Sequence, residues 1–79
     1  MRIVSDYGLV RIVHDGDPFN NAYDIRVESR DSIDSDWTLF HGFNTLSDDY
    51  AYANSREAAA RAIKQVAARV ANKIQGVAK

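Results

Sequence analysis

The sequence predicts an α+β fold, in which an antiparallel sheet of three to four strands packs against one long C-terminal amphipathic helix. Apolar and polar residues alternate within the first 43 residues, a period typical of strands. From Ala58 to Gln75 the chain is rich in alanine and free of glycine and proline, which favours a helix. With 79 residues in all, we expect residues 1–79 to form a single domain.

The sheet is expected to occupy about residues 1–43. Ile- and Val-rich segments predict two short strands, Arg2–Val4 and Leu9–His14, with a turn or kink at Gly8. One long bent strand is the alternative interpretation of the same segment. The stretch "DGDPFNN" at 15–21 predicts a loop, because it combines glycine, proline and asparagine.

Two further strands are indicated by period-2 patterns. "AYDIRVES" alternates over residues 22–29, and after the polar turn "RDSIDSD" the segment "WTLFHGF" predicts a strand over 37–43. Gly42 is expected to end or bulge that strand. The residues expected to face the helix are Tyr23, Ile25, Val27, Trp37 and Leu39. The residues expected on the exposed face are Asp24, Arg26, Glu28, Thr38 and Phe40.

A connector over residues 44–54 is expected to lead into a helix at about residues 55–75. Asn54 and Glu57 have the spacing of a capping box, with Ser55 as an alternative cap, and Gly76 is expected to stop the helix. The predicted buried stripe consists of Ala59, Ile63, Val66, Val70, Ile74 and Val77. Of these, we expect Ile63, Val66 and Val70 to contact the sheet.

Composition excludes several classes of protein. The chain has no cysteine, so neither a disulfide nor a thiolate zinc site can form. No apolar run approaches the roughly 18–20 residues of a membrane span, and the start of the chain lacks a signal-peptide pattern. We therefore expect a cytoplasmic protein, either a monomer or a homodimer, that does not contact membranes.

Charge divides the chain in two. Residues 1–54 contain ten Asp or Glu and four Arg, a formal charge of −6, whereas residues 55–79 contain one Glu and six Lys or Arg, a charge of +5. An acidic sheet region is thus joined to a basic helix. We interpret this division first as favourable electrostatics within the domain and as a source of solubility, and the alternative interpretation is a surface whose acidic side meets a basic partner.

No pattern of residues indicates catalysis or metal binding. His14 and His41 could adjoin on neighbouring strands, and Asp15 and Asp17 share a loop, but neither set has the spacing of a zinc or calcium site. Gly-x-Ser-x-Gly and glycine-rich phosphate motifs are absent from the sequence. We therefore expect a protein that is not an enzyme and that needs neither a cofactor nor a metal.

Two loops combine acidic and aromatic residues, a mixture typical of protein-binding surfaces because tyrosine gives a large contact area at little entropic cost. These acidic-aromatic loops are Asp31–Trp37 and Asp48–Tyr52. The residues expected to bind a protein partner are Asp31, Asp34, Asp36, Asp48, Asp49, Tyr50 and Tyr52. We expect neither Asp48 nor Asp49 to be needed as a helix cap, which leaves both free to face outward.

The whole chain resembles the small phage-encoded anti-CRISPR proteins in character. "DSIDSDW", "SDDYAY", the short sheet-and-helix layout and the absence of cysteine carry the resemblance. It implies a non-enzymatic inhibitor in the cytoplasm of a bacterial host. Such an inhibitor binds and blocks a host defence complex such as a CRISPR effector.

A nucleic-acid-binding module is the alternative interpretation. "NSREAAARAIKQVAARV" is similar to the second half of double-stranded-RNA-binding domains, and "HGFNTLSDDYAYANSREAAARA" resembles the last strand and helix of arm-type DNA-binding modules of phage integrases. The residues that would contact phosphates are Arg56, Arg61, Lys64, Arg69 and Lys73. Because these charges are spread around the helix and the sheet is acidic, we expect direct binding to be weak or absent.

Overall fold

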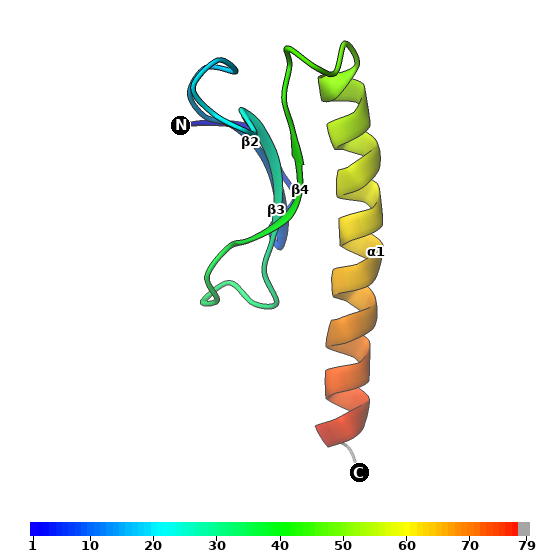
Figure 1. Cartoon of the computed structure of the whole chain (residues 1–79). Coiled ribbons are helices and arrows are strands. Elements are labelled where there is room, and N and C mark those ends of the chain that lie inside the picture. Colours follow the sequence, from blue (N-terminus) through cyan, green and yellow to red (C-terminus); the bar gives the residue numbers. More distant parts are fainter. Residues whose placement is uncertain (78–79) are drawn as a thin grey trace.

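The computed structural model describes residues 1–77, with side chains described up to residue 73. Figure 1 shows a sheet on one side and a long helix on the other, which confirms the predicted α+β fold. The strands and the helix are β1 (Arg2–Asp6), β2 (Val10–His14), β3 (Ile25–Ser29), β4 (Thr38–Phe43) and α1 (Ala51–Val77). Along these residues no helix has the length and hydropathy needed to cross a bilayer.

The strands form an antiparallel meander in the order β1-β2-β3-β4. Gly8 turns the chain between β1 and β2 with a φ of 84°, a conformation that glycine adopts without steric cost. Its N–H donates to the Asp6 carboxylate at 2.8 Å. Two short strands with a turn at Gly8 are thereby confirmed over one long bent strand.

The core lies between α1 and the sheet. Its buried residues are Val10, Ile12, Ile25, Val27, Ala51, Ala58, Ala59, Ala62 and Val66. Val4, Leu9, Phe40, Phe43 and Val70 pack against them. Alanine supplies most of the helix side, and its short side chain lets the α1 backbone approach the sheet closely.

The prediction of which residues face the helix is only partly confirmed. Ile25 and Val27 are fully buried in the core, as predicted, and Arg26 and Glu28 lie on the opposite face. The placement of Tyr23, Trp37 and Leu39 against the helix is wrong, because they lie on the face away from α1. The placement of Asp24 and Phe40 on the exposed face is also wrong, since Asp24 is buried and Phe40 packs against the core.

An irregularity in β4 explains most of these differences. Val27 pairs with His41 and Glu28 pairs with Leu39, so Phe40 is an extra residue on β4. One extra residue reverses the alternation of faces along a strand. The bulge therefore lies at Phe40 and not at Gly42, and β4 continues to Phe43.

Helix α1 begins earlier than predicted, at Ala51, and passes Gly76 to reach Val77. Of the predicted stripe, Ala59 and Val66 are buried and Val70 is half-buried, whereas Ile63 is 41% exposed. Ile63 is therefore less buried than predicted and lies at the edge of the core, where it lines a groove together with Val10 of β2. Its side chain lies to the side of the contact line that Ala58, Ala59 and Ala62 form. The side chains of Ile74 and Val77 lie outside the described residues.

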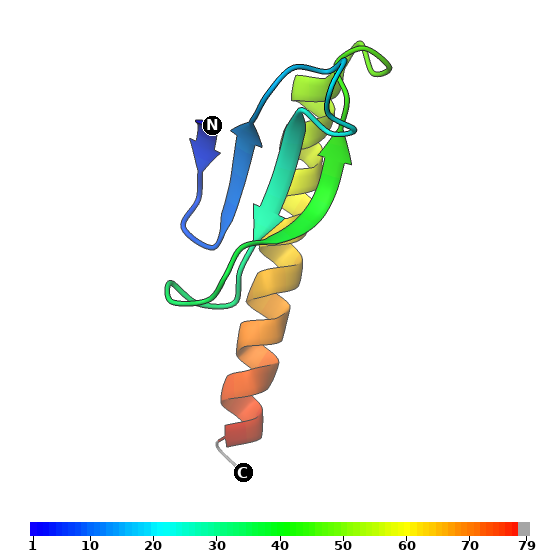
Figure 2. The ribbon, with the colours of Figure 1, turned by 60° about the vertical axis from the view of Figure 1, so that its left-hand side comes forward.

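The molecule is elongated because α1 is much longer than the strands. Twenty-seven helical residues span about 40 Å, whereas strands of five or six residues span about 17–20 Å. The radius of gyration is 14.0 Å, above the roughly 12 Å of a compact domain of this length. Figure 2 shows the C-terminal half of α1 (orange to red) extending past the sheet.

Candidate functional site

The face of the sheet opposite α1 carries a cluster centred on Trp37. Arg11 of β2 and Arg30, directly after β3, place their guanidinium carbons 4.3 and 4.2 Å from the centroid of the Trp37 ring. Arg30 also donates to the backbone oxygens of Gly8 at 3.2 Å and Ile33 at 2.9 Å. The tryptophan is thus held by two cation–π contacts, and the loop before it is tied to the neighbouring turn.

Ion pairs continue across this face. The Arg11 Nε lies 2.8 Å from a Glu28 oxygen, and Arg26 lies 3.8 Å from the other Glu28 oxygen and 3.1 Å from Asp15. The Arg11 and Glu28 side chains are only 18% and 14% exposed, so their charges are largely shielded from water. The N-terminal ammonium of Met1 also lies 3.9 Å from Asp15, so two arginines and this ammonium meet two carboxylates and the charges of the network nearly balance.

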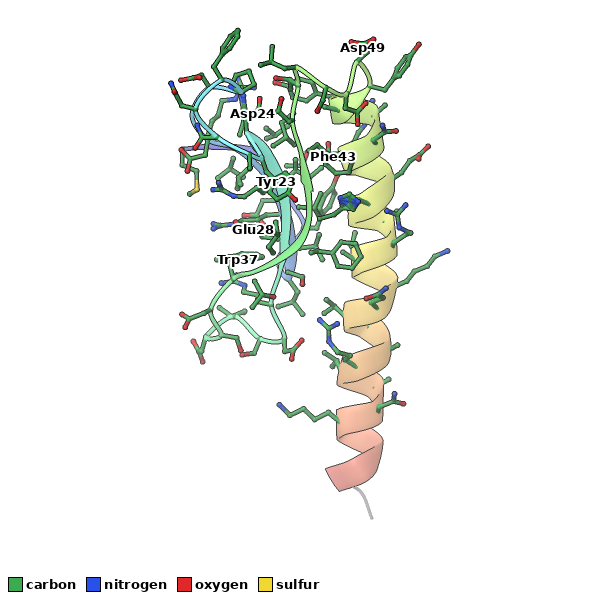
Figure 3. All side chains as sticks on the ribbon, viewed as in Figure 1. Tyr23, Asp24, Glu28, Trp37, Phe43 and Asp49 are labelled. Atoms are coloured by element: carbon green, nitrogen blue, oxygen red, sulfur yellow. The ribbon has the colours of Figure 1, made fainter. Side chains whose placement is uncertain are left out.

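Tyr23 and Leu39 complete the surface. The Tyr23 ring covers Gly42 so closely that a Cβ added there would clash with the ring, so any larger residue at this position would displace the tyrosine. Tyr23 is 46% exposed and Leu39 is 51% exposed. Figure 3 shows Tyr23, Glu28 and Trp37 on the side of the sheet away from α1. We call Arg11, Tyr23, Arg26, Glu28, Trp37 and Leu39 the open sheet face.

The first acidic-aromatic loop, Asp31–Trp37, lies next to this face. Its acidic residues Asp31, Asp34 and Asp36 are exposed. Asp31 forms an ion pair with Arg69 of α1 at 3.0 Å, so a residue expected to bind protein and one expected to bind nucleic acid neutralise each other. A hollow of about 610 Å³ between this loop and α1 is lined in part by Asp36 and Arg69.

The second acidic-aromatic loop, Asp48–Tyr52, lies at the opposite end of the sheet, where α1 begins (Figures 1 and 3). The structure therefore does not bring the two loops together into one surface. Asp49 and Tyr50 are exposed, and Tyr52 is 41% exposed with its ring edge-on to His14 at 6.3 Å.

Asp48 is not free, contrary to the sequence prediction. Its carboxylate accepts the Tyr50 N–H at 2.9 Å and the Asn54 side-chain amide at 2.8 and 3.1 Å. These bonds close the turn that starts α1. Asp48 therefore caps the start of α1, the role that the sequence predicted for Asn54. Asn54 instead donates its side-chain amide to the Asp48 carboxylate.

The basic residues of α1 do not form one surface. Glu57, Arg61 and Lys64 follow each other at spacings of four and three residues and so share the outer side, where the glutamate offsets one positive charge. Arg69 turns to Asp31, and Lys73, four residues later, shares its side. Arg56 is exposed on a third side of α1, away from the group of Arg61 and Lys64 and from the group of Arg69 and Lys73.

Asp24 is a buried carboxylate that joins the sheet to the connector. It accepts the Thr45 N–H at 2.9 Å and the Thr45 hydroxyl at 2.7 Å, and His14 Nε2 lies at 3.3 Å. Burial raises the pKa of Asp24, but the hydrogen bonds from Thr45 and His14 outweigh it and hold the pKa below 3.8. This carboxylate is ionised and fully bonded, which is the state of a structural anchor.

The histidines have structural partners. His14 meets Asp24, and His41 stacks on Phe43 with ring centroids 4.4 Å apart. Over the described part of the chain, no group of three or more His, Asp or Glu residues could hold a metal ion.

Comparisons with protein-family models, with curated proteins and with solved structures found no match to this chain. The open sheet face therefore has to be interpreted from its own chemistry. Sequence reasoning missed it because Trp37 and Leu39 were assigned to the core. The available signal was Arg11, which interrupts the Val- and Ile-rich segment 9–13.

Proposed function

We propose that this protein is a small non-enzymatic inhibitor that binds a host protein complex, such as a CRISPR effector, and blocks it by occupying part of its surface. The observation that carries the proposal is the open sheet face. It presents tryptophan, tyrosine and arginine side chains, the types that dominate binding energy at protein interfaces.

The rigidity of this face also supports the proposal. Trp37 is held by two arginines, Arg11 by Glu28, and Tyr23 by its contact with Gly42. Side chains that are ordered before binding lose little conformational entropy in a complex. Asp34 and Asp36 beside the face would meet basic groups of the partner, speeding association and fixing orientation.

The nature of the partner rests on the resemblance in size, layout and composition to anti-CRISPR proteins. Inhibition of this kind takes place in the cytoplasm of a bacterial host. The basic groove that binds nucleic acid in such an effector would complement the exposed aspartates. The nucleic-acid-binding alternative has less support, because the basic side chains of α1 fall on different sides of the helix.

Stoichiometry tests the mechanism. The protein is titrated into purified CRISPR effector complexes of several types while target DNA cleavage is measured. We expect inhibition of one type to become complete at about one protein per binding site, as for a tight binding inhibitor. Complete inhibition at a small fraction of that ratio would require turnover and would contradict a non-enzymatic role.

Two matched tyrosine variants test the surface. Tyr23→Ala removes an exposed tyrosine from the open sheet face, and Tyr50→Ala removes one from the Asp48–Tyr52 loop. We expect Tyr23→Ala to weaken binding about tenfold or more by faster dissociation, and Tyr50→Ala to weaken it less than about threefold. The reverse ranking would move the binding surface to the start of α1. Circular-dichroism melting checks that both variants fold.

A further inference from the structure

Part of the sheet is left without a helix. Within the described residues α1 packs across β2, β3 and β4 but not across β1. A helix is about 10 Å wide, whereas four strands spaced by about 4.8 Å make a sheet roughly twice as wide. Figure 2 shows β1 (dark blue) at the sheet edge that α1 does not reach.

An apolar groove of about 420 Å³ lies on this uncovered side, between the β1–β2 turn and α1. Its walls include Tyr7, Leu9, Ile63, Ala67, Val70 and Ala71. Tyr7 is 50% exposed and Ile63 is 41% exposed, so large apolar side chains face water here. Ala67 and Ala71 leave the α1 backbone accessible to close approach by another element.

The shape of the groove suits a helix. Ile63, Ala67, Val70 and Ala71 follow each other at helical spacings along one side of α1, which creates a ridge and an adjacent hollow. A second helix packs on such a surface by placing its own residues at i, i+3, i+4 and i+7 into the hollow.

The charged residues beside the groove indicate which charge a partner should carry. Among the described residues of α1 from residue 55 onward the one acid is Glu57, which stands seven residues before Lys64 and so lies about 10 Å from it along the helix axis, before the groove begins at Ile63. Lys64 stands three residues before Ala67 and seven before Ala71, so it borders the groove. Asp6 near the turn is paired with Arg11, which lies on the face of the sheet away from α1, so the Asp6 carboxylate is on that face and not on the side of the groove. A second copy of this chain would set its basic helix against this one, and like charges oppose that pairing.

We propose that the apolar groove binds an amphipathic helix of another protein whose polar face is acidic. The apolar side of that helix covers Ile63 and Val70, and its carboxylates lie beside Lys64. The groove is on the helix side of the sheet and the open sheet face is on the other, so one surface can bind when the other does not.

A pair of designed helical peptides tests the proposal. Both carry leucine at helical spacing, and their polar positions are all glutamate in one peptide and all lysine in the other. Fluorescence anisotropy measures binding to the full chain. We expect the glutamate peptide to bind about tenfold or more tightly than the lysine peptide. Equal affinities, or no binding of either peptide, would overturn the proposal.

Two alanine variants locate the contact. Ala67→Gln places a polar side chain in the groove, and Ala68→Gln makes the same change at an exposed position that does not line the groove and lies about 100° around the helix from Ala67. We expect Ala67→Gln to weaken the glutamate peptide about fivefold or more, and Ala68→Gln to change its affinity less than about twofold. An equal effect of both variants would overturn the proposal.

A second copy of the chain and a membrane surface are two other possible occupants of the groove, and each is tested separately. Sedimentation of the protein alone detects self-association, and flotation with anionic vesicles detects a membrane partner. We expect a monomer that does not float with vesicles. A dimer or a vesicle-bound form that Ala67→Gln disrupts and Ala68→Gln does not would overturn the proposal.

Discussion

At the scale of single residues, Asp24 shows how a charge can be buried without weakening the fold. The side chain is fully buried, yet its oxygens accept two hydrogen bonds from Thr45 and meet His14. A buried carboxylate with such partners stabilises its surroundings, and removing it leaves the donors unpaired.

We expect Asp24→Ala to lower the free energy of unfolding by about 2–3 kcal/mol, because the part-buried Thr45 N–H and hydroxyl lose their acceptor. Urea denaturation at neutral pH measures the change. The control is Asp34→Ala in an exposed loop, which should change stability by less than about 0.5 kcal/mol. Equal effects of the two substitutions would contradict the anchoring role.

The contribution of Asp24 to the stability of the fold should depend on pH in a predictable direction. The pKa of Asp24 is held below its ordinary value of 3.8, so the ionised form stabilises the folded state above that pH. This contribution is lost as the pH falls through the lower, folded-state pKa. The stability difference between wild type and Asp24→Ala should therefore shrink below pH 3.8. A difference that grows on acidification would contradict a stabilising role of the ionised Asp24 carboxylate.

At the scale of elements, Asp48 links the connector to the start of α1. Its carboxylate accepts from Tyr50 and Asn54, whereas the adjacent Asp49 is exposed. We expect Asp48→Ala to destabilise the protein by about 1 kcal/mol, the usual cost of losing a side chain that caps a helix start. Asp49→Ala is the matched control and should melt within about 2 °C of wild type. Identical melting temperatures of both variants would contradict the capping role of Asp48.

The buried side of α1 is the second test at this scale. Val66 is 3% exposed in the core, whereas Ile63 is 41% exposed beside the groove. Val66→Asp should cost about 3 kcal/mol or more and unfold much of a thin core, because it buries an unpaired charge. Ile63→Asp should cost about 1 kcal/mol or less. Thermal denaturation followed by circular dichroism ranks the two, and similar costs would mean that α1 is rotated about its axis.

Elements were easier to predict from the sequence than the faces that they present. Period-2 alternation, the Gly8 turn and the Ala-rich helix each follow from local chemistry, and all of them appear in the structure. The faces depend on one extra residue, Phe40, whose bulge is fixed only by pairing with β3. Trp37 lies outside the core for the same reason, and its contact with Arg11 joins β2 to a segment distant in the chain.

At the scale of the whole molecule, the division of charge along the chain becomes a division in space. The acidic half forms the sheet and its loops, and the basic half forms one helix that extends beyond the sheet (Figure 1). The two halves meet through the ion pair of Asp31 with Arg69. Sequence could predict the division of charge but not this contact, which spans 38 residues.

This arrangement gives the chain little attraction for nucleic acid. Phosphate binding needs several cations on one surface, and among the side chains described up to residue 73 the basic residues that share the outer side of α1 are Arg61 and Lys64, next to Glu57. We expect labelled duplex DNA and RNA to bind with a Kd of about 10 μM or weaker near 150 mM salt. Fluorescence anisotropy over a range of salt concentrations measures it.

Two charge-reversal double variants distinguish non-specific attraction from a specific nucleic-acid site on α1. Arg61→Glu with Lys64→Glu changes the outer side of α1, and Arg56→Glu with Lys73→Glu makes the same change of charge elsewhere. Weak binding through overall charge should fall equally in both double variants, since each removes the same long-range attraction. Submicromolar binding that only the Arg61 and Lys64 variant abolishes would instead establish a nucleic-acid site on α1 and displace the protein-binding proposal.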